Sequence, residues 1–337
     1  MLRVESRGQS RARRAHLAKI TFNRYPPLYR LASVGVVSSF ISTFHISSCS
    51  IAQEIYHRTR RRVKARMNSI ATSLQYWLVN HPSILNFSWI PGQTLGSSPL
   101  FLSLTLLSYL SLTFLLPLLR LPPLKPHILR SMSVVHNLIL LLLSFTMALG
   151  CILTIISHTP HLHWIICFPP KTPPSGPLFF WAYVFYLSKI LELVDTLLII
   201  VGNSIRRLTF LHVYHHATVL IMCYLWLQTS QSLFPVALVT NTCVHVLMYG
   251  YYLLSALGIR PRWKRVVTDC QIVQFLFSFA VSGVMLYYHF GGSGCSGFTG
   301  WCFNAVFNAS LLALFVDFHA KSYANRNKTQ QPDRHKD

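Results

Sequence analysis

Three histidines stand at a spacing that brings them to one face of a helix. His212, His215 and His216 are related as i, i+3 and i+4, and residues at these intervals lie on the same side of an α-helix. Such a face suits two chemistries. Imidazole binds iron, and neutral imidazole can act as a general base or a nucleophile at cytosolic pH. Both chemistries require further polar groups beside the histidines.

Those groups occur on neighbouring segments, again at helical spacing. Ionisable residues inside apolar segments are costly, so each one marks a candidate site. Asn, Gln and His can instead form hydrogen bonds between helices, and for Asn137, Gln274 or Asn304 taken singly this is the simpler interpretation. The polar residues on these segments are Lys189, Glu192, Asp195, Asn241, His245, Tyr252, Thr268, Asp269, Gln271 and Gln274.

The elements that must position these residues are apolar segments of roughly 20 residues, the length that crosses a bilayer. The chain of 337 residues is 52% hydrophobic and 11% charged, which disfavours a disordered basic protein and a soluble nucleic-acid binder. No stretch alternates as a membrane β-strand does. We therefore expect an all-α polytopic membrane protein with seven transmembrane helices, at 99–119, 134–157, 178–201, 208–228, 233–256, 266–290 and 299–318.

Lys and Arg are distributed unevenly between the loops, and this predicts the orientation of the spans. The loops after the first, third and fifth spans and the C-terminal tail hold 14 of them, whereas the alternate loops hold only Lys171. By the positive-inside rule, the C-terminus is cytosolic and the segment before the first span lies in the lumen of the endoplasmic reticulum. Four helices then bring the polar residues to one level near the cytosolic face.

Residues 1–66 depart from this pattern, with 14 basic residues against two Glu. Their Arg-rich end would resist translocation, while the apolar stretch 31–44 is too short to span but suits a signal-type segment. A transit peptide is a second interpretation, and translation from Met67 is a third. We expect residues 1–66 to be absent from the mature protein rather than retained, residues 67–320 to form the transmembrane domain, and residues 321–337 to form a basic cytosolic tail.

Four boxes follow one another on successive spans. They are KILELVDT at 189–196, LHVYHH at 211–216, NTCVHVLMYGYY at 241–252 and TDCQIVQF at 268–275. In this order they resemble the ELO family of fatty acid elongases, the very-long-chain 3-ketoacyl-CoA synthases of the endoplasmic reticulum. HxxHH alone would be a weak signal, but four ordered boxes are specific. The resemblance covers about residues 75–320, and residues 76–92 are similar to plant members.

The resemblance implies a reaction and a shape. The family lengthens acyl-CoA by a two-carbon unit from malonyl-CoA, releasing CO2 and CoA, and six of its helices enclose a tunnel for the acyl chain. Malonyl-CoA and acyl-CoA are then substrates, and neither a cofactor nor a metal is expected. Expected partners are membrane lipid, the ketoreductase, dehydratase and enoyl reductase of the elongation cycle, and a second copy of the chain in a homodimer. No nucleic-acid partner is expected.

Within this picture, we expect His215 to attack the acyl-CoA thioester and hold the acyl group, with His245 across the site. The two roles are exchangeable. The other expected catalytic residues are His212 and His216, which would orient the pair, and Asn241 and Gln271, which would stabilise developing negative charge. The expected supporting residues are Lys189, Glu192, Asp195, Gln274 and Tyr252, and the expected substrate-binding residues are Lys264, Thr268, Arg206, Arg207 and Tyr249. Membrane topology and lipid headgroups are a second explanation for the loop arginines.

The eight cysteines show no CxxC or other zinc spacing. Cys167 and Cys295 fall in loops predicted to face the oxidising lumen, so we expect a disulfide between them, with Cys302 as the competing partner. Asn86 is the one glycosylation sequon predicted to be luminal. Residues 286–289, at the luminal end of the sixth span, are candidates for the stop that limits acyl-chain length.

Two other classes of function remain open. A membrane di-iron desaturase or hydroxylase would bind iron through the HxxHH box but needs further histidine boxes. His158, His161 and His163 fall in a loop predicted to be luminal, on the wrong side for such a box. A channel or transporter would also place ionisable groups at one depth, although neither inverted repeats nor Gly- or Pro-broken helices are evident.

Overall fold

The computed structural model describes residues 58, 60–61, 64–120, 122–259 and 261–324, and it divides the chain into two compact units, 1–72 and 73–337. In the first unit, residues 64–72 are helical. The extension predicted at 1–66 lies almost wholly outside the described residues, as does most of the predicted cytosolic tail. Both predicted domain boundaries stay predictions, and all the candidate site residues lie in the second unit.

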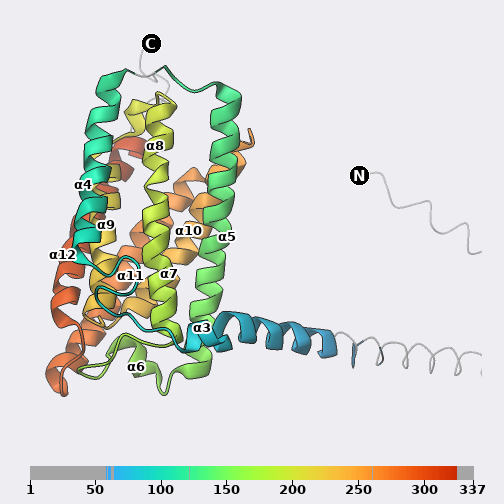
Figure 1. The fold of residues 1–337 in the computed structure, drawn as a ribbon, viewed down its shortest axis with the longest axis vertical. Helices are drawn as coiled ribbons and strands as arrows, with labels where there is room; N and C mark the ends of the chain where they lie inside the picture. Colours follow the sequence, from blue (N-terminus) through green and yellow to red (C-terminus); the bar gives the residue numbers. More distant parts are fainter. Residues whose placement is uncertain (1–57, 59, 62–63, 121, 260, 325–337) are drawn as a thin grey trace, which may run out of the picture. The chain divides into compact units, whose positions relative to one another are not determined.

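Residues 73–324 fold into a bundle of helices, and no strand occurs among the described residues apart from a lone bridge between Ser88 and Ser175 (Figure 1). The long helices are α4 (Pro99–Leu115), α5 (Pro126–His158), α7 (Pro177–Glu192), α9 (Phe210–Gln228), α10 (Phe234–Ala256), α11 (Lys264–Gly291) and α12 (Phe298–His319). The short helical segments are η1 (Tyr76–Asn80), α3 (Pro82–Leu85), η2 (Leu116–Leu119), α6 (Leu162–Ile166), α8 (Val194–Val201), η3 (Ile205–Arg207) and η4 (Ala320–Ala324).

The described part of the chain is a polytopic all-α membrane protein, as the sequence predicts. Within the described residues, six helices are long and apolar enough to cross a membrane. They are Pro99–Leu119, Pro126–His158, Phe210–Gln228, Phe234–Ala256, Lys264–Gly291 and Phe298–Ser322. The predicted count of seven stays a prediction, because the run expected at 178–201 is not one continuous helix.

That run is divided at Leu193 into α7 and α8. The Leu193 amide donates to the carbonyl of Ile190 at 3.2 Å, and the Thr196 amide donates to the carbonyl of Leu193 at 3.1 Å. Both bonds reach back three residues, which tightens the turn relative to an α-helix. With 16 and 8 residues, α7 and α8 are each shorter than a bilayer requires. The break matters because polar residues stand on both sides of it.

Several helices begin at a residue that sets their start. Pro99, Pro126 and Pro177 occupy the first position of α4, α5 and α7, where a missing N–H costs nothing. The Thr209 hydroxyl caps α9 by accepting from the amide of His212 at 3.3 Å. This cap orders the first turn of α9, which carries the histidine face.

The centre of the bundle is packed with aromatic side chains. Phe185 on α7 stacks on Trp226 on α9, with ring centroids 5.4 Å apart. On α5, a Cβ added at Gly150 would lie 2.2 Å from the Trp181 ring of α7. Only glycine allows α5 and α7 to approach this closely. This dense packing surrounds the polar groups of the candidate site and keeps them from water.

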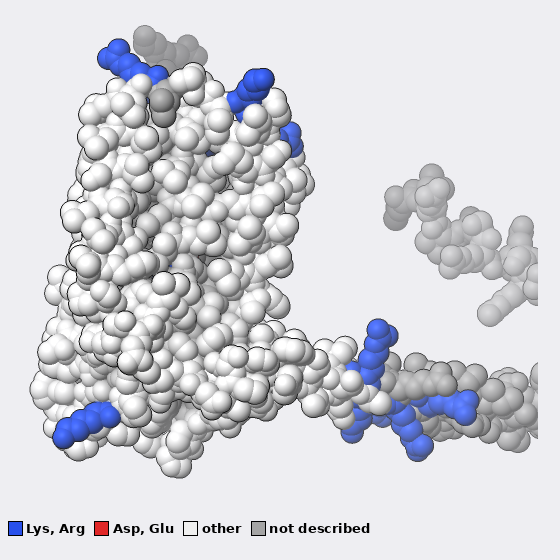
Figure 2. Space-filling view, viewed as in Figure 1, with Lys and Arg blue, Asp and Glu red and all other residues white. Residues whose placement is uncertain are grey.

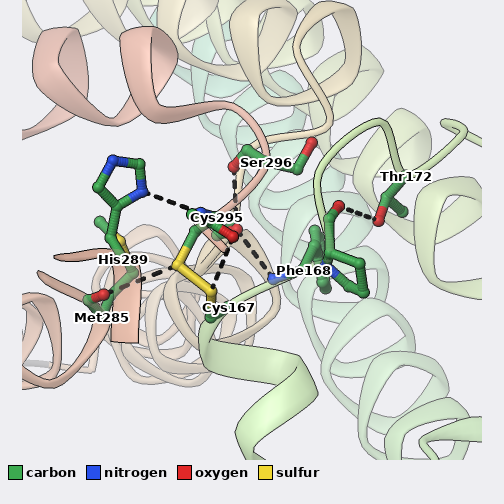
Figure 3. Close-up of a disulfide and its surroundings, with 10 residues drawn as sticks. Cys167, Phe168, Thr172, Met285, His289, Cys295 and Ser296 are labelled. Carbon is green, nitrogen blue, oxygen red and sulfur yellow. Dashed lines mark hydrogen bonds between the residues drawn. A yellow bond between two sulfur atoms is a disulfide. The ribbon is translucent and has the colours of Figure 1, made fainter. Parts of the chain in front are cut away.

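A disulfide joins Cys167, in the loop after α6, to Cys295, in the loop before α12 (Figure 3). The Cα atoms are 5.0 Å apart, and the sequence separation is 128 residues. This is the pair expected from the sequence. Cys302, named as the competing partner, is exposed and free.

Hydrogen bonds connect three loops around the disulfide. The Phe168 amide donates to the Ser232 hydroxyl at 3.0 Å, and that hydroxyl donates to the Ser296 carbonyl at 2.9 Å. The Ser296 amide donates to the Phe168 carbonyl at 2.9 Å, and the Cys295 amide donates to His289 Nδ1 at 2.9 Å (Figure 3). The loops before α10 and α12 and after α6 are therefore fixed to one another at one end of the bundle.

Removing the disulfide is expected to lower the unfolding temperature of the detergent-solubilised protein. A cross-link over a sequence separation of 128 residues restricts the unfolded chain, and its loss typically costs about 2–5 kcal/mol. Cys167→Ala should show this loss in a thermal unfolding experiment, whereas Cys302→Ala should unfold as the wild type does. Equal unfolding temperatures for wild type and Cys167→Ala would contradict a stabilising role for the bond.

Candidate active site

A buried ion pair lies at the C-terminal end of α7. Lys189 Nζ is 2.7 Å from Glu192 Oε1, and the side chains are 1% and 2% exposed. Lys189 Nζ also lies 3.4 Å from Asn241 Oδ1 on α10 and 4.3 Å from the centroid of the Phe185 ring. Buried charges are tolerated only when they are paired and further hydrogen-bonded. The contact with α10 meets part of that requirement.

His245 on α10 completes this group. Its Nδ1 lies 3.3 Å from Glu192 Oε1 and 3.5 Å from Lys189 Nζ. One nitrogen cannot donate to the carboxylate and accept from the ammonium at once. A hydrogen on Nδ1 satisfies the shorter contact and leaves the lone pair of Nε2 free, which is the form of imidazole that can attack a carbonyl or take up a proton.

Asp195 forms a second group, on the far side of the break at Leu193. Its Oδ1 lies 3.1 Å from His136 Nε2 on α5, and its Oδ2 accepts from the Tyr249 hydroxyl on α10 at 2.9 Å. His136 is 7% exposed, and Tyr249 is fully buried. Because both oxygens of the carboxylate are used, Asp195 joins α8 to the two helices that flank it.

The three histidines of α9 form the face that their spacing predicts. The rings of His212 and His216 have centroids 4.5 Å apart, and those of His215 and His216 are 5.4 Å apart. His212 Nε2 lies 2.8 Å from the Thr196 hydroxyl, which is itself 3.2 Å from the Tyr109 hydroxyl of α4. A chain of hydroxyl groups thus fixes one side of His212.

Two ring nitrogens on this face have no partner. Nδ1 of His215 and Nδ1 of His216 are buried, and neither makes a hydrogen bond within the described part of the chain. Buried polar atoms are nearly always hydrogen-bonded in native proteins, so unused nitrogens are expected where a ligand binds. The helix that carries the histidine face, α9, packs against α7, which carries Lys189 and Glu192. We therefore treat the histidine face and the ion pair as parts of one candidate site.

The structure gives some predicted residues other contacts than those expected. The oxygen of Asn241 accepts from Lys189, and Gln271 Nε2 lies 3.7 Å from Met248 Sδ. Tyr249, expected to bind substrate, donates a hydrogen bond to Asp195, and its role in substrate binding stays a prediction. Tyr252 contacts the Tyr249 ring, with centroids 6.0 Å apart, and is 36% exposed.

The remaining predicted residues lie in η3 and on α11. Lys264 is exposed at the start of α11, and Thr268, one turn further along, is buried. Arg206 and Arg207 are exposed in η3. Gln274 takes no part in the contacts of the ion pair or of Asp195. The expected roles of these residues, substrate binding for all except Gln274 and support of the site for Gln274, stay predictions.

Three residues of the site are absent from the sequence-based set. They are His136, Tyr109 and Thr196. His136 contacts Asp195, Tyr109 contacts Thr196, and Thr196 in turn contacts His212. His136 could have been found, because it is an ionisable residue within a strongly apolar segment. Tyr109 and Thr196 carry no such signal, since hydroxyl groups are common in membrane helices.

A metal centre is the alternative use of the HxxHH box. Within the residues that the structure describes, no group of three or more His, Cys, Asp or Glu is arranged to hold a metal ion. His161, which precedes α6, and His163, in its first turn, stack on one another with ring centroids 5.4 Å apart.

Comparison with known proteins identifies the family. The model of the GNS1/SUR4 family, also called ELO, matches residues 94–331, a range that includes the ion pair, Asp195 and the histidine face. The chain belongs to the GNS1/SUR4 family.

Three relatives illustrate the range of the GNS1/SUR4 family that this chain resembles. "Fatty acid elongase 3-like" of Arabidopsis thaliana is 29% identical over 276 residues, covering 76% of the chain and 94% of the relative. "Fatty acid elongase A" of Dictyostelium discoideum is 33% identical over 258 residues, covering 74% and 92%. "Very long chain fatty acid elongase 5" of Xenopus laevis is 34% identical over 160 residues, covering 45% and 51%.

Breaking the ion pair from one side is expected to destabilise the protein more than removing both charges. In Lys189→Met, the carboxylate of Glu192 stays buried without its nearest cation, a change that typically costs about 3–5 kcal/mol. The double variant Lys189→Met/Glu192→Gln leaves no unpaired charge and should recover part of the loss. Thermal unfolding in detergent makes the comparison. A double variant less stable than Lys189→Met would show that the two charges do not depend on each other.

His136→Phe is expected to lower stability because it leaves one oxygen of Asp195 without its partner in a mostly buried position. A hydrogen bond to a charged group is worth about 1.5–3 kcal/mol. His127→Phe, at an exposed position on the same helix, is the matched control and should have little effect. Thermal unfolding of the two variants, measured side by side, decides the matter. Equal losses would mean that the contact with Asp195 contributes nothing.

Proposed function

We propose that this protein is the condensing enzyme of fatty acid elongation, a very-long-chain 3-oxoacyl-CoA synthase. It joins malonyl-CoA to a long-chain acyl-CoA and gives a 3-ketoacyl-CoA, CO2 and CoA. Membership of the GNS1/SUR4 family, whose relatives above are named fatty acid elongases, supports the reaction class. The observation that carries the proposal is the buried histidine face of α9, whose His215 and His216 have Nδ1 atoms without a partner, on a helix that packs against the one carrying Lys189 and Glu192.

The reaction proceeds through an acyl-imidazole. A ring nitrogen of His215 attacks the thioester carbonyl of the acyl-CoA, the carbon–sulfur bond breaks, and CoA leaves as its thiol after taking up a proton. Malonyl-CoA then loses CO2, and the electron pair of the broken carbon–carbon bond becomes a carbanion. The carbanion attacks the acyl carbon and releases the imidazole. The buried nitrogen of His215 has no competing hydrogen bond, which supports this role.

His245 acts across the site as the base that exchanges protons with CoA, and its role and that of His215 are exchangeable. Glu192 holds Nδ1 of His245, which orients the ring and leaves Nε2 for chemistry. Asn241 has its oxygen engaged by Lys189, so its amide nitrogen is available to donate to the developing oxyanion. Gln271 can donate in the same way only after it releases the weak contact with Met248.

His212 and His216 orient the reacting pair. The hydroxyl of Thr196 fixes one side of the His212 ring, and the ring of His216 packs between those of His212 and His215. Asp195 positions α5, α8 and α10 around the histidine face rather than contacting the acyl group. No step requires a metal or a cofactor, because the two thioesters supply the acyl group and the carbanion.

The substrates fit the distribution of charge. Figure 2 shows Lys and Arg side chains of the second unit at the end where α4 ends and α5 begins. In the membrane of the endoplasmic reticulum, that end would lie on the cytosolic side. It would bind the phosphates of CoA, and the candidate contacts are Lys264, Thr268, Arg206 and Arg207. The other enzymes of the elongation cycle would work beside it, and two copies of the chain would form a homodimer.

Radiolabelled malonyl-CoA supplied to proteoliposomes with a series of acyl-CoA chain lengths tests the proposal. Wild-type protein should incorporate label into 3-ketoacyl-CoA, and His215→Ala and His245→Ala should reduce incorporation by about a hundredfold or more. His161→Ala, an exposed loop position, is the control and should match the wild type. Thermal unfolding checks that each variant is folded. Absence of incorporation by the folded wild type at every chain length would sink the proposal.

The covalent route has its own test. Incubation with acyl-CoA alone should leave an acyl group on a histidine, detectable as a mass increase on the peptide that contains His215 or His245. If condensation occurs and no such adduct forms under rapid quenching, the acyl group passes directly from one thioester to the carbanion.

A further inference from the structure

A cavity of about 450 Å³ lies between α4 and the break that separates α7 from α8. Leu104, Ser108 and Leu112 line it from α4, and Leu193 and Val194 line it from the break. Leu104 and Leu112 are 54% and 44% exposed. One wall of the cavity is therefore on the outer surface of a segment long and apolar enough to cross a membrane. We call this cavity the lateral groove, since it opens toward lipid.

The floor of the lateral groove consists of hydroxyl groups that already have partners. The side chains of Tyr109, Thr113 and Thr196 are at most 5% exposed. The Thr113 hydroxyl donates to the Tyr109 carbonyl at 2.7 Å, and the hydroxyls of Tyr109 and Thr196 lie 3.2 Å apart. A buried water needs about two to four polar partners. The hydroxyl groups of this floor already bond to other protein groups, so few are available to a water. Hydrocarbon is the better occupant.

Cations stand where the two walls of the groove end. Arg120 follows η2 at the end of α4, and Arg206 lies in η3 beyond the end of α8. The two ends are adjacent, because the Leu124 amide donates to the Val201 carbonyl at 3.0 Å. Both arginines are exposed. Helical rise places Arg120 about 11 Å beyond Thr113, the last residue of α4 that lines the groove.

Acidic side chains are scarce in the part of the chain that carries these cations. Between residues 55 and 268 the chain contains only two, Glu192 and Asp195, and both are engaged in the site. The end of the groove is therefore complementary to an anion. Basic pockets between membrane helices bind anionic lipid headgroups by this arrangement.

We propose that the lateral groove binds an acyl chain of an anionic membrane phospholipid, whose headgroup lies at Arg120 and Arg206. The charge at the end of the groove selects the phospholipid over a neutral lipid. Its floor leads directly to the histidine face, since Tyr109 contacts Thr196 and Thr196 contacts His212. A chain in the groove packs against Tyr109 and so restrains the hydroxyl pair that positions His212.

Native mass spectrometry of the purified full chain tests the site. The protein in mild detergent is offered phosphatidylserine and phosphatidylcholine with identical acyl chains. Wild type should retain phosphatidylserine in preference. Ser108→Phe fills the groove and should lose the bound lipid. Ser111→Phe, the same change at an exposed position on α4 outside the groove, should retain it.

Arg120→Ala tests the headgroup contact and should abolish the preference for phosphatidylserine while leaving some lipid bound. Leu104→Trp is a second groove-filling variant, and thermal unfolding confirms that all variants are folded. Equal retention by Ser108→Phe and Ser111→Phe would overturn the proposal, as would equal retention of the two phospholipids by wild type.

Retention of a fatty acid or of acyl-CoA, displaced by groove-filling variants, would also overturn the proposal and assign the groove to the substrate instead. The inference goes beyond the proposed condensation reaction. Because the experiment measures bound lipid, a negative result would not count against the proposed elongase activity. Absence of elongase activity would likewise not count against lipid binding.

Discussion

The buried ion pair of Lys189 and Glu192 constrains the whole site. Two charges 2.7 Å apart in an interior lined by aromatic rings can persist only if their remaining hydrogen-bonding capacity is met by neighbours held in place. Asn241 and His245, both on α10, supply those neighbours. The position of α10 relative to α7, and with it the orientation of the His245 ring, follows from satisfying this pair. The orientation of His245, which the proposed reaction requires, thus depends on satisfying two buried charges.

The break at Leu193 allows one short motif to serve two purposes. Residues before it form the ion pair, whereas Asp195 and Thr196 after it contact α5, α9 and α10. An uninterrupted α-helix advances 100° per residue and would keep Glu192 and Asp195 close to one face. The tightened turn, with bonds reaching back three residues, rotates the second half further per residue than an α-helix would. Two polar groups therefore assemble from a single stretch of eight residues.

The sequence predicts what local spacing determines. The face formed by His212, His215 and His216 requires only a helix, and its existence follows from the intervals alone. The Cys167 and Cys295 pair follows from the alternation of loops between the two sides of the membrane. Both predictions rest on regularities that a single chain displays without reference to packing.

Other features depend on how the helices rotate against each other, and spacing does not encode that. Leu193 is neither Gly nor Pro, so the break arises from tertiary contacts. The partner of Asp195 on α5, His136, was visible as a polar residue but not as a contact. The hydrogen bond from the Tyr249 hydroxyl to Asp195 was likewise not visible in the sequence. Each of these depends on contacts between segments distant in sequence.

The disulfide has a consequence for biosynthesis. Cys167 is translated before the helices from α7 to α11, and its partner Cys295 follows them. During that interval the first thiol must remain unpaired, or pair wrongly with another cysteine. The correct bond can form only when the loop before α12 reaches the loop after α6, which requires the intervening helices to be inserted and assembled. Oxidation of this pair therefore comes late in synthesis, after the helices between the two cysteines have assembled.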